Sequence, residues 1–257
     1  MRLQTLVSCV KQNIDEVASM MNLQSDSIVI NQCGKNDYTE YEHKGFAIKC
    51  YSFNERGVGL SRNNALLRAD ADIILFSDED IVYEDGYADA VLKAFEENPQ
   101  ADMLIFNMDV AEDRATYHTT DMCRVHRWNC GRYPTYSMAV RREAVIRRNI
   151  TFNLLFGGGA RYSNGEDSLF IQECLKKGMK IYALPIMIGR EIPRPSTWFD
   201  GYNDKFFYDR GVLYRYLYGR LGGVMALRFL IKHRSVMLTD KTFSEAHALM
   251  KKGLKEA

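Results

Sequence analysis

Three acidic residues, Asp78, Glu79 and Asp80, follow the apolar run "IILF" and a single serine. Carboxylates this close repel one another, so the cluster costs free energy unless a cation lies beside it. Carboxylate oxygens suit Mg²⁺ or Mn²⁺, and Mg²⁺ usually takes only one or two of them and completes its shell with phosphate oxygens. The cluster therefore indicates a divalent metal site for a phosphate-bearing ligand. Taken alone, it fits a solvated acidic turn equally well.

A second acidic pair, Glu166 and Asp167, follows the glycine cluster "FGGGA" at 156–160. Glycines allow unusual backbone angles and close approach, which suits a loop that faces a substrate. A structural role is the alternative, because Ser163 or Asn164 could cap a helix whose N-terminus either acid then stabilises. The residues alone leave both interpretations open.

Strands and helices alternate along the first half of the chain, and they must position these acids. The strands are expected from short apolar runs, and the helices from apolar residues spaced three or four apart. The expected strands are 3–10, 26–31, 46–52, 72–77 and 102–110, and the expected helices are 13–22, 59–69 and 86–98. This alternation predicts an α/β fold with a mainly parallel sheet covered on both faces. Ligands bind at the carboxyl ends of such strands, which is where the acidic cluster lies.

The second half of the chain is less regular. We expect a strand at 136–140, a basic helix at 141–149, a helix at 168–178 and a last strand at 180–186. An aromatic, helical pattern follows Pro195. We therefore divide the chain into an α/β domain at 1–195 and a C-terminal helical extension at 196–257 that packs on it.

Two enzyme classes compete for the acidic cluster. A phosphatase of the haloacid dehalogenase type ends a strand with D-x-D-x-T/V, and "DEDIV" fits this pattern, with Asp78 as nucleophile and Asp80 as general acid. Such an enzyme needs a downstream lysine and a further acidic motif at another strand end, whereas "GED" opens an expected helix after glycines. A catalytically idle nucleotide- or sugar-binding protein is a third alternative.

The segment "RGVGLSRNNALLRADADIILFSDED" (56–80) resembles the family 2 glycosyltransferases, which have the GT-A fold. That family combines a G-x-x-x-A-R-N-x-(G/A) helix, a strand and an acidic triplet of the DxD type. "GEDSLFIQECLKKG" (165–178) resembles its second signature, an acidic pair that opens a helix, and the resemblance covers residues 1–200. It implies a metal-dependent, inverting transferase that uses a nucleotide sugar and builds a bacterial surface polysaccharide.

The resemblance also implies a role for each matching residue. Asp80 would bind Mn²⁺ or Mg²⁺, and Asp78 would contact the ribose or diphosphate and contribute to the same metal site. Arg62, of the R-N pair, would contact the nucleotide, although an ordinary exposed helix arginine is the structural alternative. Asp167 would be the catalytic base, and Glu166 would orient the acceptor.

The nucleotide is expected at the ends of the first two strands, beside Cys9, Val10 and Asn31. The sequence departs from the family there, because "SCVKQN" replaces the usual P-x-Y-N, and Asn31 and Gln32 replace an Asp pair. An amide offers both a donor and an acceptor, so it can still pair with a pyrimidine edge. A UDP-sugar is therefore the expected donor, with thymidine in place of uridine left open.

The acceptor, a glycan or a lipid-linked glycan, is expected at Gly158 and Gly159, and at Trp198, which could stack on a sugar or pack in the core. Residues 196–234 are rich in aromatic residues and arginine, and Gly211 and later glycines should interrupt any long helix there. This segment could be a helical pair that closes the core, or a surface that binds anionic membrane lipids.

Charge and composition bear on three further properties: nucleic-acid binding, membrane association and the state of the cysteines. A net charge of +1 argues against a nucleic-acid binder, although residues 201–257 carry eleven Lys or Arg against five Asp or Glu. No stretch of about 20 residues is free of charge, so no spanning helix is expected. Six cysteines without C-x-x-C spacing favour reduced thiols in a cytoplasmic protein. If the basic end binds lipid, the protein would be peripheral on the inner face of the membrane.

Overall fold

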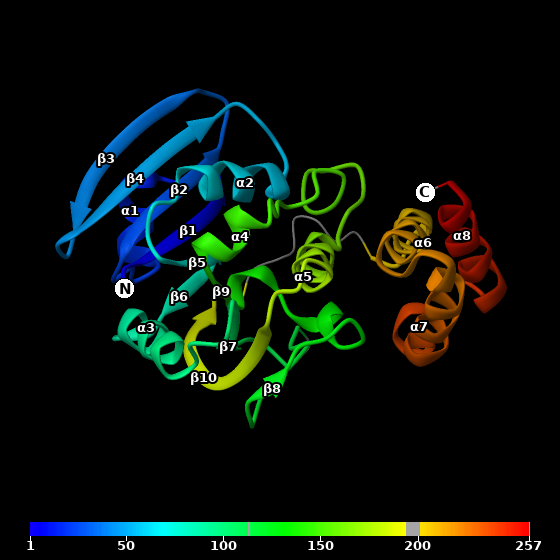
Figure 1. Cartoon of the computed structure of the whole chain (residues 1–257). Helices are drawn as coiled ribbons and strands as arrows, with labels where there is room; N and C mark the ends of the chain where they lie inside the picture. The colour runs from blue at the N-terminus through cyan, green and yellow to red at the C-terminus, as the bar shows by residue number, and fades with distance from the viewer. Residues whose placement is uncertain (113, 194–200, 257) are drawn as a thin grey trace.

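The computed structural model describes residues 1–112, 114–193 and 201–256. A mixed β-sheet runs through the first part of the chain (Figure 1), with strands in the order β3-β4-β2-β1-β5-β9-β7-β10-β6 and with β8 beside β10. The strands are β1 (Leu3–Val10), β2 (Asp26–Gln32), β3 (Asp37–His43), β4 (Phe46–Phe53), β5 (Ile73–Asp78), β6 (Ile81–Tyr83), β7 (Met103–Asp109), β8 (Cys123–Arg124), β9 (Met138–Arg141) and β10 (Ile181–Glu191).

Helices cover both faces of this sheet. The helices are α1 (Ile14–Met20), α2 (Val58–Arg68), α3 (Tyr87–Glu97), α4 (Arg142–Arg147), α5 (Glu166–Lys176), α6 (Asp204–Tyr218), α7 (Gly222–Met237) and α8 (Phe243–Glu256). Apolar residues of α1 and α3 join one buried cluster with the sheet, whereas those of α2, α4 and α5 join a second cluster. The sheet therefore has a separate apolar core on each side, as a doubly covered sheet requires.

Parallel strands at the centre of the sheet bring the acidic cluster and the expected nucleotide-binding residues to the same end of the strands. β1 pairs in parallel with both β2 and β5, and the register places Ser8 opposite Asp78. β5 is buried on both faces, which explains its continuous apolar run, whereas the equally buried β1 also contains the polar residues Gln4, Thr5 and Ser8. Because β5 ends at Asp78, the acidic cluster begins where the apolar run leaves the core.

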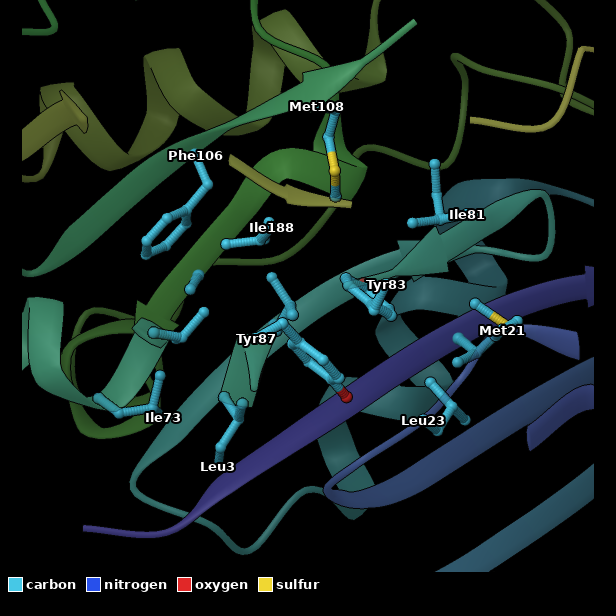
Figure 2. Packing of buried hydrophobic residues seen from close by; sticks show 14 of the residues in the cluster. Leu3, Met21, Leu23, Ile73, Ile81, Tyr83, Tyr87, Phe106, Met108 and Ile188 are labelled. Carbon is cyan, nitrogen blue, oxygen red and sulfur yellow. The ribbon is translucent and has the colours of Figure 1, made fainter. Parts of the chain in front are cut away.

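Figure 2 shows part of the core that α1 and α3 cover. Tyr83 and Tyr87 stack with their ring centroids 4.1 Å apart. The buried Tyr87 hydroxyl lies within hydrogen-bonding distance of the Thr5 and Ser25 hydroxyls, so the ring is buried without leaving its polar group unpaired. These contacts hold the chain immediately after the acidic cluster firmly against β1.

The C-terminal helices α6, α7 and α8 form a group at the end of the molecule next to α5 (Figure 1). Their own apolar cluster includes Phe207 and Met250. Two glycines let α6 and α8 touch backbone to backbone: a β-carbon at Gly211 would lie 2.1 Å from the Met250 carbonyl oxygen, and one at Gly253 would lie 2.2 Å from the Tyr208 carbonyl oxygen. Gly211 therefore lies inside α6 instead of interrupting it, and the helix ends only at Gly219.

The α/β fold with a mainly parallel sheet and C-terminal helices is confirmed. Each expected element is present close to its expected bounds, except that β10 continues five residues beyond the expected end at 186. Three short or polar strands, β3, β6 and β8, were not expected. β3 lies at the sheet edge and exposes alternate residues, so its sequence lacks a buried apolar run. The proposed domain boundary at residue 195 falls outside the described residues and stays a prediction.

Candidate active site

A buried arginine joins the acidic segments that the sequence places far apart. The Arg62 side chain on α2 is only 4% exposed. Its Nη2 lies 3.0 Å from Asp78 Oδ1, and its Nη1 lies 3.1 Å from Glu166 Oε1 and 3.2 Å from Asp167 Oδ1. One guanidinium group thus binds carboxylates from the end of β5 and from the first turn of α5.

The backbone before α5 explains how its two acids reach this position. Gly165 precedes the helix with φ of +111°, a conformation that favours glycine. A β-carbon at Gly165 would also lie 2.5 Å from the Leu213 side chain of α6. The expectation that Ser163 or Asn164 caps α5 is wrong, because Gly165 is the N-cap residue and makes no side-chain cap hydrogen bond. Glycine at this position lets α6 pack closely against the start of α5.

The glycine cluster packs against the same acids. Gly157 has φ of +101°, and a β-carbon there would lie 2.8 Å from Glu166 Cδ. The Gly158 carbonyl accepts a hydrogen bond of 2.9 Å from Val58 N at the start of α2, whereas Gly159 is exposed. The cluster therefore connects α2 to Glu166, and acceptor binding by Gly158 and Gly159 stays a prediction.

Burial changes the acidity of both α5 carboxyl groups. Burial, reinforced by the nearby Asp167 charge, raises the pKa of Glu166 to about 7. Burial also raises the pKa of Asp167, against the opposing effects of Arg62 and of a hydrogen bond from Thr135. A carboxylate with a raised pKa accepts a proton more readily, which is what a general base requires.

Thr135 is a site residue that the sequence analysis missed. It lies in the 3₁₀ turn Thr135–Ser137, is buried, and donates its hydroxyl hydrogen to Asp167 Oδ1. The surrounding sequence "YPTYS" lies outside both family-like segments, 56–80 and 165–178. Only the fold shows that a residue from the turn before β9 fixes the orientation of the Asp167 carboxylate.

The expected nucleotide-binding residues meet at the ends of β1 and β2. Glu79 Oε2 accepts a hydrogen bond of 2.7 Å from Val10 N, so the middle acid of the triplet is tied to β1. The Asn31 amide binds the backbone of Gln12 through both of its ends, at 3.2 Å and 3.1 Å. Cys9 is buried, and its sulfur lies 3.7 Å from Asn31 Oδ1. Nucleotide contacts by these residues and by Arg62 stay predictions.

Asp78 and Asp80 are the expected metal ligands. Among the described residues, no group of three or more His, Cys, Asp and Glu side chains is placed to hold a metal ion. Asp78 already binds Arg62, and the Asp80 carbonyl accepts a hydrogen bond of 2.7 Å from Ile192 N. Carboxylate oxygens at a strand end still fit Mg²⁺ or Mn²⁺, provided that a diphosphate supplies the remaining oxygens.

A cavity of about 430 Å³ opens beside Asp167. Its wall comes partly from the turn around Arg132 and Pro134, and partly from the C-terminal residues Tyr202 and Arg210. The C-terminal helices thus contribute to the site as well as to the core. Trp198, the third expected acceptor residue, lies outside the described residues.

The sheet, with its acidic segments at the strand ends, has the architecture of the GT-A glycosyltransferases. The chain belongs to glycosyl transferase family 2, because the model of that family matches residues 3–154, more than half of the chain. A comparison with curated proteins found no match. Family membership identifies the enzyme class as a glycosyltransferase and decides against the phosphatase alternative.

Solved structures agree on the fold. The structure of S. aureus TarS 1-349 in complex with UDP-GlcNAc aligns with a TM-score of 0.67 and 15% identity, over 100% of this chain and 80% of that chain. The mannosyltransferase PcManGT from Pyrobaculum calidifontis, in complex with GDP-Man and Mn²⁺, aligns with a TM-score of 0.55 and 13% identity, over 100% of this chain and 74% of that chain. At these identities the likeness shows the fold alone.

Proposed function

We propose that this glycosyltransferase moves a sugar from a UDP-sugar to a hydroxyl group of a glycan or lipid-linked glycan, with inversion at the anomeric carbon. The observation that carries the proposal is the Arg62 network. It connects Asp78, at the strand end where the nucleotide is expected, to Asp167, which lines the cavity. The donor would then bind on the Asp78 side of Arg62, and the acceptor on the Asp167 side.

Asp167 is the proposed general base. Arg62 and Thr135 both bind its Oδ1, which fixes the carboxylate in the cavity wall and assigns proton transfer to Oδ2. In this proposal the acceptor hydroxyl loses its proton to Asp167 while its oxygen attacks the anomeric carbon from the face opposite the diphosphate. A single displacement of this kind inverts the configuration. Glu166, which lies beside Asp167 on Arg62, maintains the arrangement.

A divalent metal ion is part of the proposal. Asp80 and Asp78 would hold it, and when bound it stabilises the negative charge that develops on the departing diphosphate. The two proteins of similar fold support a nucleotide-sugar donor in general, since TarS 1-349 was solved with UDP-GlcNAc and PcManGT with GDP-Man and Mn²⁺. The setting, synthesis of a bacterial surface polysaccharide, rests on the family resemblance alone.

A screen of nucleotide sugars tests the proposed donor. UDP-, dTDP- and GDP-sugars are incubated with the protein and Mn²⁺, and the released nucleoside diphosphate is measured with and without a chelator. We expect release of UDP from at least one UDP-sugar and its loss when the metal is removed. Release of GDP alone would contradict the uridine assignment, and no release from any donor would contradict transfer itself.

We also propose that α7 binds an anionic membrane surface. No helix in the described part of the chain is long and apolar enough to cross a membrane. On α7, however, Val224, Leu227 and Ile231 are 66%, 37% and 51% exposed, and their spacing places them on one side of the helix. Arg228 and Lys232 are exposed beside them, and α7 contains no Asp or Glu. An apolar stripe flanked by basic residues is typical of helices that bind lipid interfaces.

Vesicle sedimentation tests this surface. The protein should bind vesicles that contain phosphatidylglycerol, should not bind phosphatidylcholine vesicles, and should dissociate as salt screens the charges. Each basic residue near such a surface contributes about 1 kcal/mol, so the double variant Arg228→Glu/Lys232→Glu should weaken binding at least tenfold. Lys251→Glu/Lys252→Glu, on exposed positions of α8, is the matched control and should change binding less. Equal effects of both variants would argue against α7.

A further inference from the structure

An arginine of the C-terminal helices, Arg210, is half-buried in the wall of the cavity beside Asp167 and forms no ion pair with a described residue. Arg210 on α6 lines the same cavity as Asp167. Its Nε–H is buried and has no hydrogen-bond partner among the described residues. Burial lowers the pKa of Arg210, but the pKa of arginine is so high that the group stays charged.

The neighbours of Arg210 do not neutralise it. The adjacent acid, Asp209, is buried and accepts hydrogen bonds from Ser163 and Lys205. The guanidinium lies 5.2 Å from the Phe206 ring centroid and 4.9 Å from that of Phe229. Such cation–π contacts offset only part of the hydration that the partly buried guanidinium loses. An anion in the cavity would remove this imbalance.

A second arginine points to the same ligand. Arg132 lines the same cavity and lies in the turn Cys130–Arg132, far from the C-terminal helices in the sequence. It donates a hydrogen bond of 3.0 Å to the Tyr133 hydroxyl, and no ion pair of Arg132 or Arg210 exists among the described residues. Asp167, the one acid among the described residues of the wall, is already bound by Arg62. Two arginines that form no ion pair with a described residue therefore line a cavity of about 430 Å³ beside the proposed base.

From this arrangement we propose that the acceptor is an acidic glycan, whose phosphate or carboxylate group binds Arg210 and Arg132 while a nearby hydroxyl approaches Asp167. The proposal rests on the proposed function, because it treats the cavity as the acceptor site. Guanidinium groups bind oxyanions through paired N–H donors, which gives orientation as well as affinity. Recognition of this kind would discriminate against neutral glycans, since these would leave both arginines without a partner.

Binding of small oxyanions to the full chain tests the proposal. Glycerol 3-phosphate and glucuronate serve as probes for phosphate and carboxylate, glycerol is the neutral control, and binding is followed by ligand-observed NMR titration. We expect saturable binding of one or both anions and none of glycerol. Arg210→Met and Arg132→Met should each weaken that binding at least tenfold. Arg215→Met, on an exposed position of the same helix, should leave it unchanged.

Several outcomes would overturn the proposal. One is the absence of saturable anion binding, and another is equal binding by the unaltered protein and by both cavity variants. If Arg210→Met fails to fold, Arg132→Met still decides the question, because Arg132 is exposed. Donor hydrolysis by the unaltered protein is measured separately. Hydrolysis without anion binding contradicts only the acidic acceptor, and Arg210-dependent anion binding without hydrolysis contradicts only sugar transfer.

Discussion

Replacing Asp167 by asparagine is expected to reduce donor turnover by about 10²- to 10⁴-fold, the usual contribution of a general base. The amide has nearly the same shape as the carboxylate but cannot take a proton from the acceptor. Binding of UDP with Mn²⁺ should stay within a few fold of the unaltered protein, because Asp167 lines the cavity, whereas Asp78 lies at the strand end where we propose that the nucleotide binds. Turnover is measured as released UDP, and binding by calorimetry.

Glu166→Gln is the matched comparison, since both acids bind the same Nη1 of Arg62. Glu166 is packed against Gly157 and is only 11% exposed, whereas Asp167 is 29% exposed and lines the cavity. We therefore expect a smaller loss of turnover from Glu166→Gln. A larger loss from Glu166→Gln than from Asp167→Asn would move the base role to Glu166, and full activity of both variants would remove the pair from catalysis.

The sequence carried enough local information to predict the central sheet and the acidic segments at its edge. Buried parallel strands such as β5 read as continuous apolar runs, and the position of Asp78 at the end of that run follows directly. β3 and β6 lack such a run and were not predicted. β3 is an exposed edge strand, and β6 has only three residues. Short or solvent-facing strands depend on their partners more than on their own sequence.

Contacts between distant segments could not be read from the sequence. The expected alternatives for Arg62 were a nucleotide contact and an exposed helix residue, yet the structure buries it among three carboxylates. The distance from Arg62 to Asp167 in the sequence is 105 residues, and no local pattern encodes their pairing. Thr135 was missed for the same reason. Arg210 lies in a segment already noted for its aromatic residues and arginines, but only the packing of the whole chain shows that it lines the same cavity as Asp167.

Replacing Arg62 by leucine is expected to lower the free energy of unfolding by about 3 to 5 kcal/mol at pH 8, the usual result of removing one partner of a buried ion pair. Asp78, Glu166 and Asp167 would then face one another without a cation. The loss should shrink towards pH 5, because two of these acids escape the repulsion by taking up protons. Urea unfolding at pH 5, 6, 7 and 8 measures it.

The sign follows from the pKa values. In the unaltered protein burial raises the pKa of Glu166 from its ordinary 4.5 to about 7, and it raises that of Asp167 as well. Between those values the folded state binds more protons than the unfolded state, so this contribution to stability is complete below pH 4.5 and is lost as the pH rises through 7. Arg62 lowers both pKa values. In the Arg62→Leu variant, the free energy of unfolding should therefore fall more steeply as the pH rises.

Arg68→Leu is the matched control for this prediction. Arg68 lies on the same helix, binds the Asn64 carbonyl oxygen at 2.8 Å and stacks on the rings of Tyr51 and Phe53, with no carboxylate partner among the described residues. Its removal should cost about 1 kcal/mol or less at every pH. A loss from Arg62→Leu that is equally small, or that does not change between pH 5 and pH 8, would show that the three carboxylates do not depend on Arg62. A variant that unfolds cooperatively at pH 5 but does not fold at pH 8 would be the extreme form of the expected result, because only the protonated acids could then occupy the site together.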